Sequence, residues 1–307
     1  MKAFTCDQFK VPLPEWHRFP MRKYALLRER LEAADWAAGV EILTPRRATE
    51  EELARAHDAE YVARVKSGRL TPDEVRLLGF PWTPLLVERS RRSVGATIEA
   101  CQAAVVDGVA VNLAGGTHHA FRDHGGGYCV FNDAAVASRF MQDQGQALRV
   151  LIVDCDVHQG DGTASIFRDD ETVFTFSIHG ARNYPPVTPP SDLDVELDDG
   201  IGDDEYLGAL GRGLATAIDR ARADLAIYLG GADPFVGDQL GRLKVSKDGL
   251  RERDALVLRS CRAAGIAVAV TMAGGYAEEV DDTVAIHLET VRQATLAAEG
   301  GPPAAPG

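Results

Sequence analysis

The sequence has few cysteines and no long apolar run, and both scarcities narrow what the protein can be. Its 307 residues include five cysteines, an odd number, and none of them forms a C-x-x-C pair. A disulfide framework is therefore not expected, which fits a reducing compartment. No apolar run reaches the ~18 residues of a membrane-spanning helix, and the start, MKAFTCDQFK, lacks the apolar region of a signal peptide. We expect a cytoplasmic protein, and its high usage of Ala, Arg and Gly suggests a bacterial one.

Positively charged residues are also relatively few: the chain has 33 Lys and Arg and 46 Asp and Glu, which gives a net charge of -13. An acidic surface repels phosphate, so nucleic acid is not an expected partner. The charge would attract a basic peptide or a polyamine, although solubility alone is a simpler explanation for it. No glycine-rich stretch reads G-x-x-x-x-G-K-[ST], so the phosphate-binding loop of nucleotide hydrolases is absent.

Apolar runs and helical patterns alternate along the chain. The runs are almost wholly apolar, as expected of strands buried on both faces of a parallel sheet; they are Val109–Leu113, Arg149–Val153, Thr172–Ile178, Leu225–Leu229 and Ile266–Thr271. The helical patterns are Met21–Ala37, Glu50–Ser67, Thr83–Asp107, Asn132–Gln144, Asp204–Ala223, Lys247–Ala264 and Ala277–Ala298. Thr49 and Glu52 predict a capping box. The alternation predicts an α/β protein, a central mostly parallel sheet flanked by helices, with one domain over residues 1–298 and a disordered tail over 299–307.

Each of these predicted strands is followed by a polar segment, and most of these segments are rich in glycine. Leu113 precedes AGGTHHA, Val153 precedes DCDVHQGDG, and Leu229 precedes GGAD. The other two strands run into HG and MAGGY. Open α/β sheets bind ligands beyond the carboxyl ends of their strands, so these segments predict a site at one edge of the sheet.

The segment DCDVHQGDG carries metal-ligating residue types. Asp154, Asp156 and His158 alternate, so in an extended chain their side chains point the same way. Zinc accepts such oxygen and nitrogen ligands, and a catalytic site leaves a position for water. Asp233, at the end of another strand, is the best third ligand. An isolated Asp-x-His is more often a pair of loop residues without a metal. Together with Asp233 and the histidine pair His118 and His119, however, it favours a metal site.

Two histidines and a tyrosine add acid–base chemistry. Amide hydrolysis needs a base for water and an acid for the amine, and His118 and His119 have a suitable pKa for both. Asp154 and Asp161 are candidates to orient them. Tyr276 follows two glycines and could donate to a developing oxyanion. Structural hydrogen bonding of the histidines, and packing of the tyrosine at a helix start, are the alternatives.

The ordered set AGGTHHA, GGGYCVFND, VDCDVHQGDGT, GGADPFVGD and AGGY resembles the histone deacetylase family over about residues 17–290. That family includes acetylpolyamine amidohydrolases and bacterial deacylases. The segments FPMRKY, DDEYLGAL and GDQLGRLKVS look most similar to the class IV branch and its bacterial relatives. The resemblance implies the arginase/deacetylase fold and one Zn²⁺ per chain.

The resemblance also implies residue roles. Metal ligands would be Asp156, His158 and Asp233. His119 would be the general base and acid, paired with Asp161. His118, paired with Asp154, would assist it, and Tyr276 would polarise the scissile carbonyl. Substrate-binding positions would be Gly127, Tyr128, Leu240 and Arg22, the last near an internal channel. A monovalent cation site for K⁺ would use Asp154, Asp156, His158, Ser177 and Ile178, the second and third through their backbone.

Three departures from the family, and one further position, bear on the substrate. The histidine loop reads AGGTHHA where familiar eukaryotic members read RPPGHHA, and Gln159 stands where many relatives carry another histidine. The tyrosine motif also has a shorter glycine run. Polyamine-selective relatives can carry a glutamate seven residues after the third ligand, and here that position is Leu240. An apolar residue there disfavours a dedicated polyamine site.

Three functions follow as hypotheses. The first is deacylation of acyl-lysine in peptides or proteins. The second is hydrolysis of a small acylated amine such as an acetylpolyamine. The third is an inactive metal-bearing binding module, which is weakest because every expected catalytic position is filled. An arginase-type enzyme, which shares the fold, uses two Mn²⁺ ions and more aspartates than one Asp-x-His and one Asp supply.

Overall fold

The central feature of the structure, a computed structural model that describes residues 1–14 and 16–300, is one eight-stranded sheet. Every paired strand is parallel to its neighbour, in the order β2-β1-β3-β8-β7-β4-β5-β6. The strands are β1 Lys2–Phe4, β2 Glu41–Leu43, β3 Val109–Asn112, β4 Val150–Asp154, β5 Val173–Gly180, β6 Leu193–Leu197, β7 Leu225–Leu229 and β8 Ala267–Thr271. The sheet flanked by helices is the arginase/deacetylase fold that the resemblance implies.

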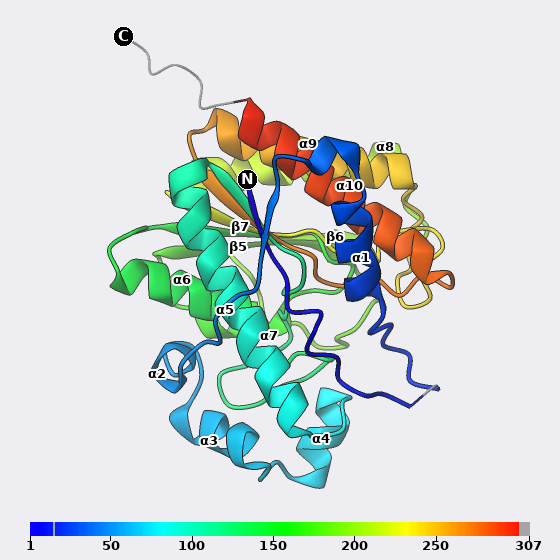
Figure 1. Cartoon of the computed structure of the whole chain (residues 1–307). Coiled ribbons are helices and arrows are strands. Elements are labelled where there is room, and N and C mark those ends of the chain that lie inside the picture. Colours follow the sequence, from blue (N-terminus) through cyan, green and yellow to red (C-terminus); the bar gives the residue numbers. More distant parts are fainter. Residues whose placement is uncertain (15, 301–307) are drawn as a thin grey trace.

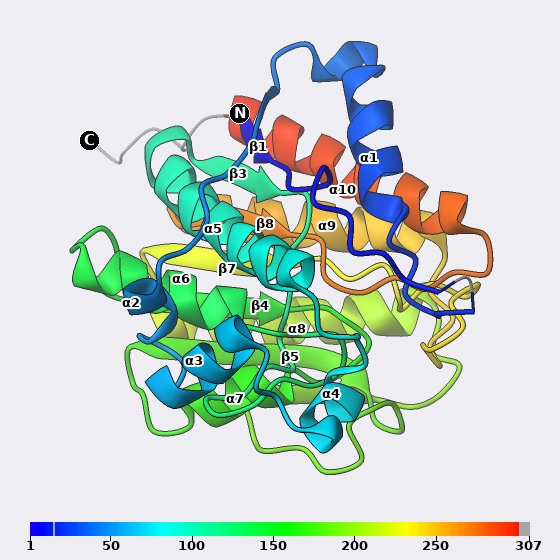
Figure 2. The same cartoon turned by 60° about the horizontal axis from the view of Figure 1, so that its bottom comes forward.

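Helices cover both faces of this sheet (Figures 1 and 2). They are α1 Lys23–Glu32, the 3-10 turn η1 Asp35–Ala37, α2 Glu50–Leu53, α3 Ala59–Ser67, α4 Pro72–Leu78, α5 Pro84–Asp107, α6 Asp133–Asp143, α7 Asp161–Phe167, α8 Asp203–Ala221, α9 Lys247–Ala263 and α10 Val280–Glu299. One apolar core lies between the sheet and α1, α8, α9 and α10. A second core lies between the opposite face and α3, α5 and α6.

The five predicted apolar runs are continuous because each of these strands contributes to both cores. Leu151 and Val153 of β4 belong to the first core, while Val150 and Ile152 belong to the second. Side chains alternate across a strand, so a strand covered on both faces needs apolar residues at every position. The five predicted strands are confirmed to within about two residues at each end.

The predicted helix over Glu50–Ser67 is wrong, because it is broken into α2 and α3. The residues between them leave the helix to pair with another segment. The backbone N–H of Asp58 donates to the Arg122 carbonyl at 2.8 Å, and His57 Nδ1 contacts the Phe121 carbonyl at 2.8 Å. Long-range partners therefore replace the helical hydrogen bonds here. The Thr49 capping box at the start of α2 is confirmed.

The other differences lie in short elements. The pattern over Met21–Ala37 yields α1 and then the separate turn η1. The strands β1, β2 and β6 and the helices α4 and α7 were not predicted, and none exceeds seven residues. Such lengths carry little periodicity, although α4 has a visible start signal in its own capping box at Thr71 and Glu74.

At the C-terminus, α10 ends at Glu299, and residues 301–307 of the predicted tail lie outside the described residues. In the described part of the chain, no helix is both long and apolar enough to span a bilayer. All five cysteines are free and buried.

Candidate active site

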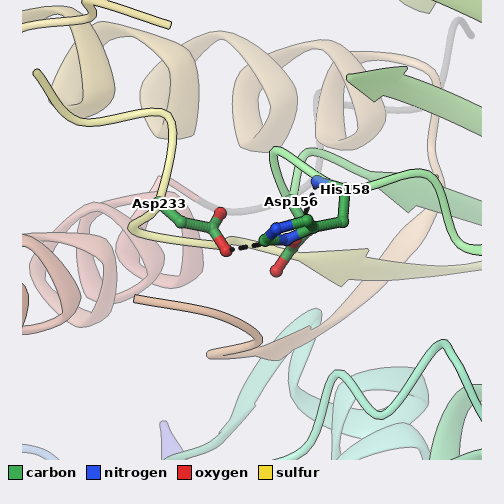
Figure 3. A group of neighbouring side chains, drawn as sticks. All are labelled: Asp156, His158 and Asp233. Atoms are coloured by element: carbon green, nitrogen blue, oxygen red, sulfur yellow. Dashed lines mark hydrogen bonds and ion pairs between the residues drawn. The ribbon is translucent and has the colours of Figure 1, made fainter. Parts of the chain in front are cut away.

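Two strand ends bring together a buried group of three potential metal ligands. Asp156 and His158 lie on the loop after β4, and Asp233 lies on the loop after β7 (Figure 3). One ligand atom from each residue lies within 4.8 Å of the other two. His158 Nδ1 is 2.9 Å from Asp156 Oδ1 and 3.4 Å from Asp233 Oδ2. The parallel register of β4 with β7 explains the approach, since both chains leave the sheet at the same edge.

The charges of this group fit a bound cation. Burial and the nearby Asp156 carboxylate raise the pKa of Asp233 to about 7. Burial lowers the pKa of His158, but Asp156 and Asp233 outweigh it and raise the value to about 10. Asp233 Oδ2 is buried and accepts no hydrogen bond from any described residue. The raised pKa values show that the two close carboxylates favour positive charge beside them, and a metal ion at these ligands would supply it in place of the protons.

The backbone holds both carboxylates in place. The Gly274 N–H donates to Asp156 Oδ2 at 2.7 Å, and the Val157 N–H donates to Asp233 Oδ1 at 2.9 Å. A Cβ at Gly274 would lie 1.9 Å from Asp233 Oδ2 and 2.5 Å from Asp156 Oδ2. Only glycine lets the segment after β8 approach so closely.

Two histidine–aspartate pairs lie beside this group. His118 Nδ1 is 2.7 Å from Asp154 Oδ2, and His119 Nδ1 is 2.7 Å from Asp161 Oδ1. The two imidazole centroids are 4.1 Å apart. Each carboxylate accepts from Nδ1, which leaves Nε2 of the same ring as the atom available for proton transfer.

The two histidines titrate in opposite directions. Burial lowers the pKa of His118, but Asp154 and Asp156 outweigh it and raise the value to about 9. Burial and the adjacent His118 lower the pKa of His119 to about 4. At neutral pH, one ring is therefore charged and its neighbour is neutral, and a neutral imidazole can accept a proton.

Tyr276 faces the same site from the segment after β8. Its backbone N–H donates to Asp238 Oδ2 at 2.6 Å, and Lys23 Nζ lies 5.3 Å from its ring centroid. Burial, followed by the charges of Asp156 and Asp233, holds the pKa of Tyr276 well above its ordinary value. The phenol therefore keeps its proton and can act as a hydrogen-bond donor.

Five of these side chains line one cavity of about 850 Å³. Its floor includes His118, His119, Asp156, His158 and Tyr276. Gly127, Tyr128 and Leu240 also line it, as the resemblance implies for substrate-binding positions. A Cβ at Gly127 would lie 2.5 Å from His119 Cδ2, so a larger residue there would displace that imidazole. Exposed Arg76, Arg182 and Arg242 mark the mouth.

The structure does not bring every expected residue to the cavity. Arg22 is exposed and is not among the cavity residues, while the next residue, Lys23, is buried beside Tyr276. Two residues of the expected K⁺ site lie side by side, because β4 and β5 pair Asp154 with Ser177, one residue before Ile178. In the structure the Ser177 hydroxyl contacts His179 Nδ1 at 2.9 Å. Occupation of this site by a cation stays a prediction.

Two further residues that sequence reasoning passed over support the site. Asp238 accepts from the N–H groups of Leu240, Gly241 and Tyr276, and so joins two loops of the cavity. Its position five residues after Asp233, in the same polar segment, was the available signal.

Fully buried Arg253 of α9 lies behind the metal-ligating loops. Its NH1 donates to the carbonyl of Gly231 at 2.5 Å and to that of Cys155 at 3.5 Å. Its charge is neutralised by Asp254, whose Oδ1 lies 2.8 Å from Arg253 NH2. No pattern in α9 distinguishes Arg253 from the surface arginines beside it, so only the packing reveals this residue.

The fold and these side chains define a class of protein, namely one with the arginase/deacetylase fold and a buried site that could bind a metal ion. Residues 17–291 match the sequence model of the histone deacetylase domain. An uncharacterised protein of Picosynechococcus sp. is 44% identical over 91% of this chain and 93% of its own. Histone deacetylase 2 of Arabidopsis thaliana is 30% identical, over 91% of this chain and 75% of its own.

Among solved structures, the HDA15 HD domain superposes with a TM-score of 0.80, covering 98% of this chain and 95% of its own. At 21% identity this likeness supports the fold alone. The chain belongs to the histone deacetylase family. Membership supports a hydrolytic deacetylase or amidohydrolase activity.

Proposed function

We propose that this protein is a zinc-dependent deacylase that hydrolyses the amide of acyl-lysine in peptides or proteins. The observation that carries the proposal is one cavity lined by His118, His119, Asp156, His158 and Tyr276. Asp233 completes the possible metal-ligand group beside Asp156 and His158, and Asp154 and Asp161 contact the two histidines. Nitrogen and oxygen ligands of this number suit a catalytic zinc site. The family match over residues 17–291 supports one deacetylase-like domain over residues 1–298.

Asp156, His158 and Asp233 would hold one zinc ion, which when bound supplies a Lewis acid toward the acyl carbonyl and the attacking water. His119, neutral because burial and His118 lower its pKa, takes a proton from the water at Nε2. Asp161 accepts from Nδ1 and fixes the ring for that transfer. The water oxygen bonds to the acyl carbon as the proton leaves.

Tyr276 donates its phenol proton as a hydrogen bond to the carbonyl oxygen, where negative charge develops. His118, held charged by Asp154 and Asp156, adds positive charge beside the reacting carbonyl. His119 then returns its proton to the amine nitrogen as the carbon–nitrogen bond breaks. The products are a free lysine amine and a carboxylic acid.

The proposal also includes a second cation, a cellular location and an origin. A K⁺ ion at Asp154, Ser177 and the neighbouring backbone is supported by the strand register that joins them. A cytoplasmic location is supported by five free cysteines, since disulfides form in oxidising compartments. A bacterial origin stays a prediction from composition.

The test is hydrolysis of acetyl-lysine and longer acyl-lysine peptides, and of acetylspermidine, by the zinc-loaded protein. His119→Ala should abolish turnover, while His124→Ala, an exposed histidine away from the cavity, should retain it. Turnover of peptides that disappears only in the first variant supports the proposal. Turnover of acetylspermidine alone would instead assign a small-molecule amidohydrolase. Failure on every acyl amide, with one zinc bound, would overturn both assignments.

A further inference from the structure

One face of α5 lines the inner part of the cavity. Leu86, Arg89, Ser90 and Ser93 all line it, and their spacing places them on the same side of the helix. Leu86, Arg89 and Ser93 are buried, in contrast to the exposed arginines at the mouth. The cavity therefore has a buried part, on the side of α5, that carries a guanidinium and two hydroxyls; we call it the inner end.

Arg89 is a buried cation without a carboxylate partner. It is 7% exposed, its NH1 donates to the Cys6 carbonyl at 3.2 Å, and its guanidinium lies 4.2 Å from the Tyr24 ring centroid. Within the described residues, no carboxylate oxygen lies within 4.0 Å of its nitrogens, whereas Arg92 on the same helix is paired with Glu88. Burying an unpaired charge is costly, and an anion in the cavity would offset the cost.

A second buried cation lies close by. Lys23 Nζ is 5.4 Å from the same Tyr24 ring and donates to the carbonyls of Ala273 and Gly275. It too lacks a carboxylate within 4.0 Å among the described residues. In a chain with a net charge of -13, two unneutralised buried cations around one ring create a local positive field.

The two hydroxyls complete an anion site. Within residues 16–300, the Ser90 and Ser93 side chains make no hydrogen bond, although the Ser93 carbonyl accepts from Asn112 and Thr97. Hydroxyl groups beside a guanidinium are donors that suit a carboxylate. Phe19, Met21 and Leu86 also line the cavity, and the Phe19 ring centroid lies 6.2 Å from that of Tyr24 and 6.1 Å from that of Tyr276. Apolar walls that end in donors match a chain of methylenes that ends in a carboxylate.

We propose that the inner end of the cavity binds a carboxylate at the far end of the substrate's acyl chain, so that the enzyme removes dicarboxylic acyl groups from amines. This inference rests on the proposed function. The leaving amine occupies the side of the cavity that opens to solvent, so the acyl chain extends inward toward Arg89. Water supplies the hydroxyl to the acyl carbon and a proton to the amine as the carbon–nitrogen bond breaks, and the product is a free dicarboxylic acid.

The test compares acyl-lysine peptides in pairs of equal chain length. Succinyl, glutaryl, adipoyl and suberoyl chains are set against butyryl, pentanoyl, hexanoyl and octanoyl chains. At the best length, the carboxylated member should have at least about tenfold higher kcat/KM, the contribution of a charge-assisted hydrogen bond. Arg89→Met should remove this preference, while Arg92→Met, an arginine of α5 outside the cavity, should keep it.

A second measurement does not depend on turnover. The monohydroxamates of adipic and suberic acid should bind more tightly than hexanoyl and octanoyl hydroxamates, and Arg89→Met should equalise each pair. If Arg89→Met does not fold, Arg89→Lys and Ser90→Ala should each narrow the difference.

Hydrolysis of uncharged chains with no preference at any length would overturn this inference and leave the proposed function standing. The same result, with inhibition by the released monocarboxylate, would mean that Arg89 holds a product, and would also overturn it. If the protein hydrolysed no acyl amide, both this inference and the proposed function would be overturned.

Discussion

At the scale of single residues, partners decide how the site histidines behave. His118 and His119 are adjacent and both buried, yet the pKa of the first is raised to about 9 and that of the second is lowered to about 4. Asp154 and Asp156 raise the pKa of His118 above the effect of burial, whereas for His119 burial and the adjacent His118 outweigh its single carboxylate partner, Asp161. A pair of identical side chains is thereby divided into a charged and a neutral member, as acid–base catalysis at neutral pH requires.

Replacing Tyr276 with phenylalanine tests its part in the reaction. The change removes the hydroxyl that we propose as a donor to the substrate carbonyl and preserves the ring, which packs against Lys23 and Phe19. We expect kcat to fall on the order of 100-fold, as for the loss of one donor to an oxyanion. Steady-state kinetics beside a zinc determination checks this. A loss below about threefold, with the metal retained, would contradict the assignment.

His57 predicts a loss of stability in acid. Its Nδ1 donates to the Phe121 carbonyl at 2.8 Å, and its Nε2 accepts from the Asn132 N–H at 2.9 Å, so the ring must be neutral. Burial lowers its pKa from 6.5 to about 4. As the pH falls below 6.5, His57 of the unfolded chain binds a proton, whereas His57 of the folded protein stays neutral until about pH 4. The free energy of unfolding should therefore fall by up to about 3 kcal/mol as pH drops through this interval, and change little above it.

Urea unfolding between pH 4 and pH 7 measures this effect, with His57→Gln as the matched variant. Glutamine can donate and accept in the same places but does not titrate, so its stability should fall less steeply. Equal slopes for the two proteins would show that His57 is not the group responsible.

At the scale of secondary structure, helix α9 supports the metal-ligating loops from behind. Arg253 donates to the carbonyl of Cys155, which immediately precedes Asp156, and to that of Gly231, which lies two residues before Asp233. Thr290 of α10 donates to Asp254 Oδ2 at 2.7 Å, and the Tyr228 hydroxyl of β7 donates to Asp254 Oδ1. One buried ion pair thus joins two helices to two ligand-bearing loops.

Removing Arg253 should weaken metal binding. Arg253→Met leaves Asp254 buried without its partner, and we expect a stability loss of about 3–5 kcal/mol. Zinc affinity should fall about 10- to 100-fold, because the loops that carry the ligands lose their support. Competition with a chelator measures the affinity. Arg251→Met, on the exposed side of α9, is the control and should change neither quantity.

If Arg253→Met does not fold, Arg253→Lys retains the charge and cannot reach both carbonyls as a guanidinium does, so its zinc affinity should fall as well. Full affinity in the lysine variant would show that charge alone, and not the bonds to the two carbonyls, matters.

The elements also show how far local sequence patterns reach. The runs at β4 and β7 were predictable because burial on both faces demands apolar residues throughout. The break between α2 and α3 was not, because its cause is a hydrogen bond between Asp58 and Arg122, distant in sequence. The same holds for Arg22, whose neighbour Lys23 is the residue that packing places beside Tyr276.

At the scale of the whole molecule, a metal ion would join two loops that are distant in sequence, one after β4 and one after β7. A metal ion that binds the folded protein and not the unfolded chain raises the free energy of unfolding by about 2.7 kcal/mol when the free metal concentration is 100 times its Kd. We therefore expect zinc to raise the thermal midpoint of chelator-treated protein. Asp233→Asn, which retains the shape of the side chain but not its charge, should show a much smaller rise. Identical shifts in the two proteins would mean that zinc binds elsewhere.

The sequence by itself determined the kind of fold and the chemistry of its site. Apolar runs ending in Asp, His and Gly require buried parallel strands that deliver polar groups to one edge, and this follows from local residue types. Only the tertiary structure decided which groups meet. The register of β4 with β7 brings Asp233 to His158, and α5 brings Arg89 to the inner end of the cavity. Such contacts depend on how layers pack, and no local pattern records them.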